Sequence, residues 1–298
     1  MSLDLVNLYG RQYATNVQIL LQQKGSKLSG AVDTDSYTGD QASPVDQIGA
    51  VEASVVTTRF ADMPRTDAPT ARRWVFPTDY DVNQLIDKFD KLRLLSDPQS
   101  KYVTNATLGL GRKKDREILL AFTGTAKTGV NGGTSTSFTA ANEVDVATGG
   151  ANSRINTAKI RAVREIMESN HIDFSMEEAY IGVTAKDLSA MRNEIQMIGS
   201  EYKNGDAPIL VNGEVTKFLG FNFIHCELIE TIMAGTNEVT LPVWVKSGMH
   251  LGMWNDITTD VAERKDLRGL PWQAYAYMTC GATRLEENKV YAIESYRA

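Results

Sequence analysis

One loop of the chain comes close to a phosphate-binding motif but lacks the residues that would hold the phosphate. Residues 124–129, GTAKTG, have two glycines at the spacing of such a loop. However, Val130 and Asn131 stand where the motif needs lysine followed by serine or threonine, and the loop follows a predicted helix rather than a strand. Without the lysine the loop cannot hold phosphate, so we interpret it as a plain flexible loop.

The histidines do not have the spacing of a metal site. His171, His225 and His250 are isolated from one another, and only His225 has a cysteine neighbour, Cys226. Adjacent residues on a strand point to opposite faces of the sheet, so this pair cannot easily share one ion. We therefore expect ordinary structural histidines, no bound metal and no cofactor.

The motifs of nucleophilic and acid–base catalysis are missing as well. The chain has no Gly-x-Ser-x-Gly sequence and no cysteine-containing catalytic signature. The carboxylate pairs Asp33/Asp35 and Glu177/Glu178 are of a kind that occurs in any acidic protein, and without a pocket that raises a pKa they are solvated. The sequence predicts no catalytic residue, and we expect that the protein is not an enzyme.

A group of arginine and aromatic residues is the strongest candidate for a functional surface. Residues 48–78 are predicted to form a β-hairpin with arms 48–60 and 70–76 and a proline-containing tip, 62–69. Arginine and tryptophan are favoured at protein interfaces. The alternative is a solvated β-arm, but the arginines and aromatic residues alternate along the arms rather than gathering at the tip. The candidate contact residues are Arg59, Arg65, Arg72, Arg73 and Trp74.

The N-terminal segment is predicted to be an arm. Residues 3–23 have apolar residues at close to a four-residue step, which indicates an amphipathic helix. Residues 25–45 are polar and small, so we expect them not to pack on themselves but to stay loose or to order against something else. The helix adds three candidate inter-subunit contacts, Leu5, Tyr9 and Tyr13.

A long helix over residues 97–123 is the main element that would hold these surfaces in place. Asp97 is a good N-cap, Pro98 sits at the first helical position and Gly124 is a natural stop. A helix of this length spans about 40 Å. Shorter helices are predicted over residues 79–92, 157–169 (opened by Asn156 or Ser153) and 185–199, with strands near 137–140, at 177–184 and through most of the C-terminal part. This order is mixed α+β without a repeating βαβ pattern.

Composition excludes several classes of protein. The 298 residues carry a formal net charge of −6, which argues against tight wrapping on nucleic acid because such binding needs clustered lysine and arginine. No apolar run approaches the ~20 residues that a membrane span needs, and the N-terminus lacks the features of a signal peptide. Only two cysteines are present, which excludes a disulfide framework. We expect a soluble protein made in a reducing cytoplasm, with no membrane partner.

The order of these elements resembles that of the major capsid proteins of tailed bacteriophages, which have the Hong Kong 97-like fold. The resemblance covers nearly the whole chain, and it is carried by the order of the elements rather than by one diagnostic motif. Three stretches resemble the family most. They are residues 97–126, residues 179–194 (AYIGVTAKDLSAMRNE) and residues 241–294, in which a Trp-x-Lys-x-Gly strand precedes Gln273 and the Gly281-Ala-Thr-Arg284 sequence.

The resemblance implies an α+β fold with five parts. Residues 1–47 would be an N-terminal arm, 48–78 an extended loop over a neighbouring subunit, 79–174 a peripheral domain with the spine helix 97–123, 175–257 an axial domain, and 258–298 the return to the peripheral domain. Some relatives join their subunits by an isopeptide bond from a lysine on the extended loop, but residues 46–80 contain no lysine. We therefore expect a shell that is held non-covalently or by a separate cementing protein.

The implied function is that of a major capsid protein. It would assemble with itself, as hexamers and pentamers, into the icosahedral shell around the double-stranded DNA of a tailed bacteriophage. Assembly would take place in the host bacterial cytoplasm, the protein would reside in the virion, DNA would be contacted only loosely, and any scaffolding, portal or cement proteins would be separate chains. Two alternatives are an encapsulin-like cellular compartment, which the long arm and polar linker disfavour, and a cytosolic enzyme with no recognisable site, which would elute as a small oligomer.

Overall fold

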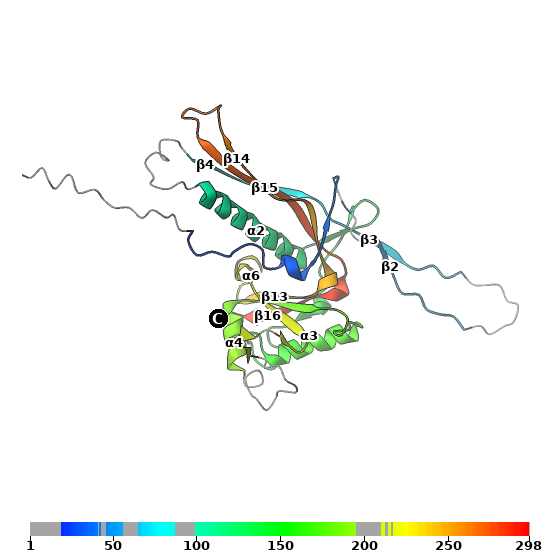
Figure 1. Ribbon diagram of the computed structural model, residues 1–298. Coiled ribbons are helices and arrows are strands. Elements are labelled where there is room, and N and C mark those ends of the chain that lie inside the picture. The colour runs from blue at the N-terminus through cyan, green and yellow to red at the C-terminus, as the bar shows by residue number, and fades with distance from the viewer. Residues whose placement is uncertain are drawn as a thin grey trace, which may run out of the picture. The chain divides into compact units, whose positions relative to one another are not determined.

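The computed structural model describes residues 19–40, 42, 46–55, 65–86, 99–194, 210–211, 214–215 and 217–297. By its internal contacts the chain divides into two compact units. The smaller unit contains Asp79–Arg112, Asp256–Met278 and the described residues up to Gly25, and the larger unit contains Ser26–Thr78, Lys113–Asn255 and the residues from Thr279 onward. Helix α2 (Gln99–Thr123) and strands β14 (Met249–Glu263) and β15 (Trp272–Arg284) contribute residues to both units (Figure 1).

The larger unit is built around a six-stranded mixed sheet with the order β11-β12-β8-β13-β16-β7. In that order its strands are Lys217–Phe218, Phe221–His225, Ala179–Val183, Glu238–Val245, Val290–Tyr296 and Glu143–Val144. β8 is parallel to β12, β13 is antiparallel to both β8 and β16, and β16 is parallel to β7. Val243 of β13 lies opposite Ile181 on one side and Tyr291 on the other. Leu241–Val245 are all buried, which is typical of a central strand that is covered on both faces.

Besides part of α2, the described residues of the same unit form the helices α3 (Thr157–Ser169), α4 (Ala185–Asn193) and the short α6 (Leu228–Ile232). α3 contacts β16 and β7, and it buries Ile160, Val163 and Met167. The prediction of this helix is confirmed, and its N-cap is Asn156, whose side-chain oxygen accepts from the backbone N–H of Lys159 at 2.9 Å. The strand–helix sequence predicted from residue 177 onward is confirmed as β8 and α4, while residues 195–199 lie outside the described residues.

The remaining described elements are short. They are η2 (Ser29–Ala31), β1 (Asp33–Ser36), β2 (Asp46–Ile48), β3 (Thr70–Trp74), β5 (Ala126–Thr128), β6 (Thr134–Thr136), η3 (Ala140–Asn142), β9 (Leu210–Val211), β10 (Glu214–Val215), η5 (Lys246–Gly248) and η6 (Glu287–Lys289). β9 pairs with β10, and β2-β3-β5-β6 forms a four-stranded sheet. The strand predicted near residues 137–140 lies slightly earlier, as β6 at Thr134–Thr136, while residues 137–139 have no strand pairing and Ala140 begins η3. Instead, the ring of Phe138 lies against the guanidinium of Arg284.

The long helix is confirmed over Gln99–Thr123, while its predicted cap residues 97 and 98 lie outside the described residues. The expected apolar stripe is buried at Ala106, Leu110, Ile118, Leu119 and Phe122. The helix ends at the predicted glycine, since the N–H of Gly124 donates to the carbonyl oxygen of Leu120 at 3.1 Å.

A buried arginine binds the C-terminal end of α2. Arg284, at the end of β15, is fully buried, and its Nη1 donates to the carbonyl oxygens of Phe122 at 2.6 Å and Gly124 at 2.8 Å. Its Nε donates to the carboxylate of Glu287 at 2.7 Å. The arginine thus satisfies carbonyl groups that a helix end leaves without partners, and it places a positive charge at the negative end of the helix dipole.

A second buried ionic network joins α4 to the C-terminal end of β16. The Asp187 carboxylate is fully buried and accepts hydrogen bonds from Thr184 and Ser295, each at 2.6 Å. Arg297 donates to both of its oxygens, at 2.6 and 3.0 Å. Burial alone would raise the pKa of Asp187, but the hydrogen bonds from Arg297, Ser295 and Thr184 outweigh it, and the pKa is lowered.

The helix predicted over residues 79–92 is wrong. Thr78–Ile86 form strand β4, at the edge of the sheet β1-β14-β15-β4, and residues 87–92 lie outside the described residues. The less exposed positions of β4 alternate, at Tyr80, Val82, Gln84 and Ile86. The apolar residues Val82, Leu85 and Ile86 fit a helical period, but only Val82 and Ile86 fit the strand alternation and Leu85 is 51% exposed, so pairing with the neighbouring strand decides the structure.

Candidate subunit interface

The predicted β-hairpin is present at its base. β2 and β3 are antiparallel, with Asp46 opposite Arg72 and Ile48 opposite Thr70. The N–H of Gly49 donates to the carbonyl oxygen of Pro69 at 2.7 Å and closes the ladder. Residues 50–55 and 65–69 are not in strands, so the regular arms expected up to residue 60 and from residue 70 are confirmed only next to the base. Beyond the pair of Gly49 and Pro69, the described residues 50–55 and 65–68 therefore lie outside the strand ladder.

Two of the four candidate arginines lie on the exposed side of the hairpin. Arg72 donates through Nη2 to the Asp46 carboxylate at 2.8 Å, and its guanidinium lies 5.7 Å from the ring centroid of Trp74. Arg65 pairs with Asp67, two residues away, at 2.8 Å. Both ion pairs are solvent-exposed, and such pairs contribute little to the stability of the subunit. Arg59 lies outside the described residues.

Arg73 and Trp74 instead belong to the packing of their own chain. Arg73 is only 7% exposed, and it donates to the carbonyl oxygen of Leu285 at 2.8 Å and pairs with Glu287 at 3.2 Å. Burial lowers the pKa of its guanidinium, while the negative charge of Glu287 opposes that shift. The indole N–H of Trp74 donates to the carbonyl oxygen of Gly129 at 2.7 Å. Whether either residue also touches a second subunit stays a prediction.

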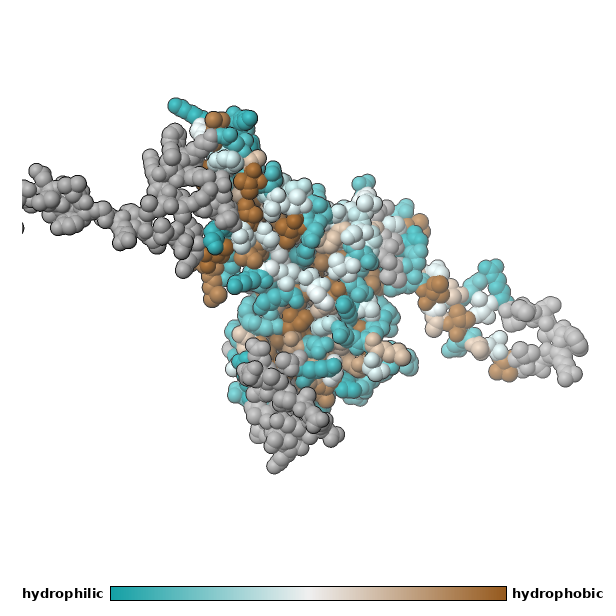
Figure 2. All heavy atoms as spheres, in the orientation of Figure 1, coloured by the Kyte–Doolittle hydropathy of each residue, from teal (hydrophilic) through white to brown (hydrophobic). Residues whose placement is uncertain are grey.

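The end of β2 and the segment after it expose aliphatic side chains that the described part of the chain does not bury. Ile48, Val51 and Val55 are 75%, 53% and 86% exposed. Figure 2 shows hydrophobic atoms among hydrophilic ones along the part of the hairpin that it colours. Exposed aliphatic side chains gathered on one segment indicate an interaction surface, whereas scattered ones do not. These residues were not among the candidates from the sequence, although the run of alanine and valine from Ala50 to Val55 carries the signal.

The segment that leads into the hairpin is fixed to the larger unit. The Asp115 carboxylate of α2 accepts from the Ser26 hydroxyl at 2.5 Å and from the backbone N–H groups of Lys27 and Leu28 at 2.9 and 3.1 Å. Leu28, Ala31 and Val32 are buried, and β1 pairs in parallel with β14. Of the two expected outcomes for residues 25–45, residues 26–36 therefore show the second: they order against other elements, because α2 and β14 supply the polar and apolar partners.

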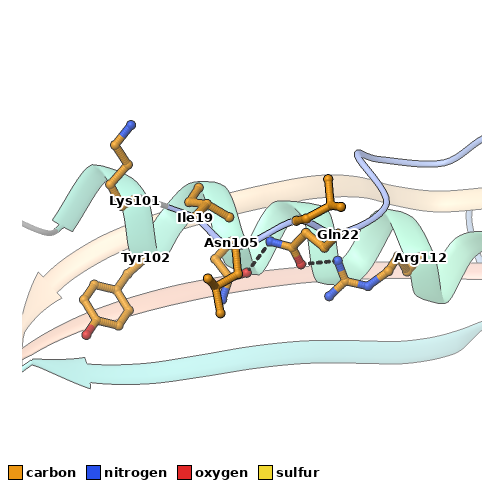
Figure 3. Close-up of a pocket in the computed structure, with 8 residues that line it drawn as sticks. Ile19, Gln22, Lys101, Tyr102, Asn105 and Arg112 are labelled. Carbon is orange, nitrogen blue, oxygen red and sulfur yellow. Dashed lines mark hydrogen bonds between the residues drawn. The ribbon is translucent and has the colours of Figure 1, made fainter. Parts of the chain in front are cut away.

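Residues 19–22 line a hollow beside the first turns of α2 (Figure 3). Gln22 donates to the side-chain oxygen of Asn105 at 2.8 Å and accepts from Arg112. The hollow has a volume of about 540 Å³ and is lined by Ile19, Leu20, Leu21, Gln22, Lys101, Tyr102, Asn105 and Arg112. The predicted helix over residues 3–23 is wrong for residues 19–23, which are not helical, since they lie along α2 through these hydrogen bonds. Leu5, Tyr9 and Tyr13 lie outside the described residues.

A buried carboxyl group makes the larger unit sensitive to pH. Glu294 of β16 is 7% exposed and accepts from the Thr240 hydroxyl of β13 at 2.7 Å. Lys159 of α3 donates to its carbonyl oxygen at 2.7 Å, while Glu143 on the neighbouring β7 brings a second carboxylate. Burial, followed by the hydrogen bond and negative charge of Glu143, raises the pKa of Glu294 to about 7. The folded chain thus holds a proton that the unfolded chain releases at lower pH.

We expect Glu294→Gln to stabilise the free subunit at pH 8 by about 2–3 kcal/mol and to change its stability little at pH 4.5. The folded pKa, about 7, lies above the ordinary value of 4.5, so the wild-type chain loses stability as pH rises from 4.5 to 7. Glutamine carries no charge, so the stability of the variant does not fall in this way as pH rises. Urea unfolding at the two pH values measures the difference, with Glu165→Gln on the exposed side of α3 as the control. If the stability of the variant and of the wild type changed equally with pH, Glu294 would not have a raised pKa in the folded chain.

No group of three His, Cys, Asp or Glu side chains within the described ranges is placed to hold a metal ion. The helices in those ranges also include none long and apolar enough to span a membrane.

The chain matches the phage capsid protein family over residues 5–296, and so it belongs to that family. It is a capsid protein that assembles with copies of itself into the shell of a phage and resides in the virion. No curated protein matches the chain.

Solved capsid structures share the fold over nearly the whole chain. The acid-stable capsid of Helicobacter pylori bacteriophage KHP30 gives a TM-score of 0.74 at 11% identity and covers 99% of this chain and 98% of that one. The capsid of the cyanophage P-SCSP1u gives 0.72 at 14% identity, with 98% and 94% covered. The capsid of an empty GTA particle gives 0.71 at 13% identity, with 100% and 98% covered. The predicted α+β phage capsid fold is confirmed.

Proposed function

We propose that the protein is the major capsid protein of a tailed bacteriophage and forms an icosahedral shell of hexamers and pentamers around double-stranded DNA. Membership of the phage capsid protein family supports the shell, and the net charge of −6 suits a lining that releases DNA rather than binding it tightly. On this proposal the protein is not an enzyme, and it assembles in the host cytoplasm. Any scaffolding, portal and cement proteins are separate chains.

Within this proposal the five parts keep their predicted bounds, namely the arm 1–47, the extended loop 48–78, the peripheral segments 79–174 and 258–298, and the axial domain 175–257. In the six-stranded sheet, β7 and β16 from the peripheral segments pair with one another, and β16 pairs with β13 of the axial segment. The observation that carries the proposed assembly role is the exposure of Ile48, Val51 and Val55, at the end of β2 and just after it. A subunit gains the burial of such residues only from a neighbour.

We expect that replacing residues 50–68 by Asn-Gly abolishes shells and leaves the subunit folded. The hydrogen bond between Gly49 and Pro69 already brings the two ends together, and Asn-Gly forms a two-residue turn between paired strands. Negative-stain microscopy and size-exclusion chromatography measure the particles, and thermal melting of the free subunit measures its fold. A Gly/Ser replacement of equal length is the control for the length of the loop. Particles of normal size from the shortened chain would contradict the proposal.

A further inference from the structure

We propose that Tyr37, His250 and Trp254 form an acid-sensitive clasp, which holds residues 33–39 on β14 at neutral pH and releases them in acid. Residues 33–39 lie just before β2, the first strand of the hairpin. The clasp would therefore control, through pH, whether the chain that enters the hairpin is fixed to the larger unit. This regulation is a property of the subunit and does not depend on the proposed shell function.

Main-chain contacts place residues 33–39 along β14. Strand β1 pairs in parallel with β14 from Asp33 to Ser36, and the N–H of Tyr37 continues the pairing by donating to the carbonyl oxygen of Met253 at 2.8 Å. The indole N–H of Trp254 donates to the carbonyl oxygen of Gly39 at 2.7 Å. The segment is thus held at its strand and at the residues just after it.

The ring of Tyr37 is the centre of the clasp. Its centroid lies 5.7 Å from that of the His250 ring and 5.5 Å from that of the Trp254 ring. The Tyr37 hydroxyl and Nε2 of His250 share a hydrogen bond of 2.9 Å. The ring also packs on the backbone of β14 at Gly252, where an added Cβ would stand only 3.1 Å from Cδ2 of Tyr37. These contacts accompany nearly complete burial of His250, which is 2% exposed.

The burial of His250 makes the clasp sensitive to acid. Burial lowers the pKa of His250 below its ordinary value of 6.5, and the negative charges of Asp35 and Asp33 oppose that shift only in part. The contribution of neutral His250 to the clasp is therefore complete above pH 6.5 and is lost as pH falls through the lowered pKa. When residues 33–39 leave β14, water reaches the ring and stabilises its charged form.

The elements around His250 bring few other ionisable groups to it. β1 brings Asp33 and Asp35, and burial together with Asp35 raises the pKa of Tyr37 to about 12, so its phenol stays neutral in acid. β15 and β3 carry Arg284 and Arg73, whose guanidinium groups are bound by backbone carbonyl groups. Histidine is the residue type in this set that gains a charge between pH 7.5 and pH 5.

Hydrogen exchange of the free subunit tests the clasp. Protection factors, which correct each amide for its intrinsic exchange rate at the same pH, are measured for residues 33–39 at pH 7.5 and pH 5. Protection of these residues should fall at least tenfold in acid. Protection of β13 should not fall, because protonation of Glu294 stabilises the larger unit in this range. Equal protection of residues 33–39 at the two pH values, or a parallel loss in β13, would overturn the clasp.

The variant His250→Gln separates the charge of His250 from its packing. Glutamine stays neutral in acid and can still form a hydrogen bond with the Tyr37 hydroxyl, so protection of residues 33–39 should no longer depend on pH. The matched control is His225→Gln, because His225 is exposed and pairs with Glu227 at 2.7 Å, and this variant should keep the wild-type loss. If His250→Gln lost protection in acid as the wild type does, another group would release the segment and the proposal would be wrong.

Nuclear magnetic resonance of the wild-type subunit gives a readout that needs no variant. The chain has three histidines, and the ring signal of His250 can be identified by its contact with the ring of Tyr37. This signal should titrate below pH 6.5, over the same range in which residues 33–39 lose protection. Titration at the ordinary value, or over a range separate from the loss of protection, would contradict the clasp.

Discussion

Replacing Arg284 with methionine is expected to destabilise the free subunit by about 3–5 kcal/mol. The side chain is fully buried, and it holds the carbonyl oxygens of Phe122 and Gly124 together with the carboxylate of Glu287. Methionine fills similar space but leaves the carbonyl oxygens without this donor and the Glu287 carboxylate with Arg73, at 3.2 Å, as its remaining counter-charge. Such a loss is a large fraction of the stability of a typical domain.

Urea unfolding of the purified subunit measures this effect. The matched control is Arg264→Met, because Arg264 forms an exposed pair with Asp266 and its loss should change stability by less than about 1 kcal/mol. If both variants unfold at the same urea concentration as the wild type, the hydrogen bonds of Arg284 to the end of α2 do not stabilise the subunit.

Asp187→Ala is expected to have an effect of similar size, about 3–5 kcal/mol at neutral pH. The substitution leaves Arg297 with only its second carboxylate partner, Glu230 at 3.0 Å, and removes the acceptor for Thr184 and Ser295. Asp266→Ala, which breaks the exposed pair, is the control.

The effect of Asp187→Ala should also depend on pH in a defined direction. The pKa of Asp187 is lowered in the folded chain, so its contribution is complete above the ordinary value of 3.8 and is lost as pH falls through the folded pKa. The difference between variant and wild type should therefore shrink in strong acid. A difference that stays constant down to pH 2 would show that Asp187 acts through packing rather than through its charge.

The sequence alone was sufficient to predict those helices in which the capping residues and the spacing of apolar residues indicate the same element. α3 has a side-chain cap at Asn156 and a buried stripe at the helical period, and α2 has both a stripe and a terminal glycine. β4 could not be predicted in this way, because Val82, Leu85 and Ile86 fit a helical period, whereas pairing with a distant strand forms β4 and leaves Leu85 51% exposed. The partners of residues 26–36 could not be named for a related reason: Asp115 and β14 lie far along the chain.

For the candidate interface, too, the sequence predicts local features but not which residues the tertiary structure covers. Alternation along a strand predicts that Arg72 and Arg73 point to opposite faces, but it does not say which face the subunit covers. The structure buries Arg73 against Leu285 and Glu287 and leaves Arg72 outside. The hollow beside α2 could not be found from sequence either, because Leu20 and Leu21 read as part of a helical stripe. Exposure of these leucines depends on tertiary structure alone.

The placement of β16 has a consequence for how the subunit is made. This strand lies between β13 and β7, and Arg297, just beyond it, closes the network on Asp187. Near the other end of the chain, the carbonyl oxygen of Ala31 accepts from the indole of Trp244, a contact between residues 213 positions apart. Such long-range contacts form late, so the larger unit cannot finish folding on the ribosome until its last strand has emerged. Prematurely terminated chains would lack a completed subunit and would be excluded from the growing particle.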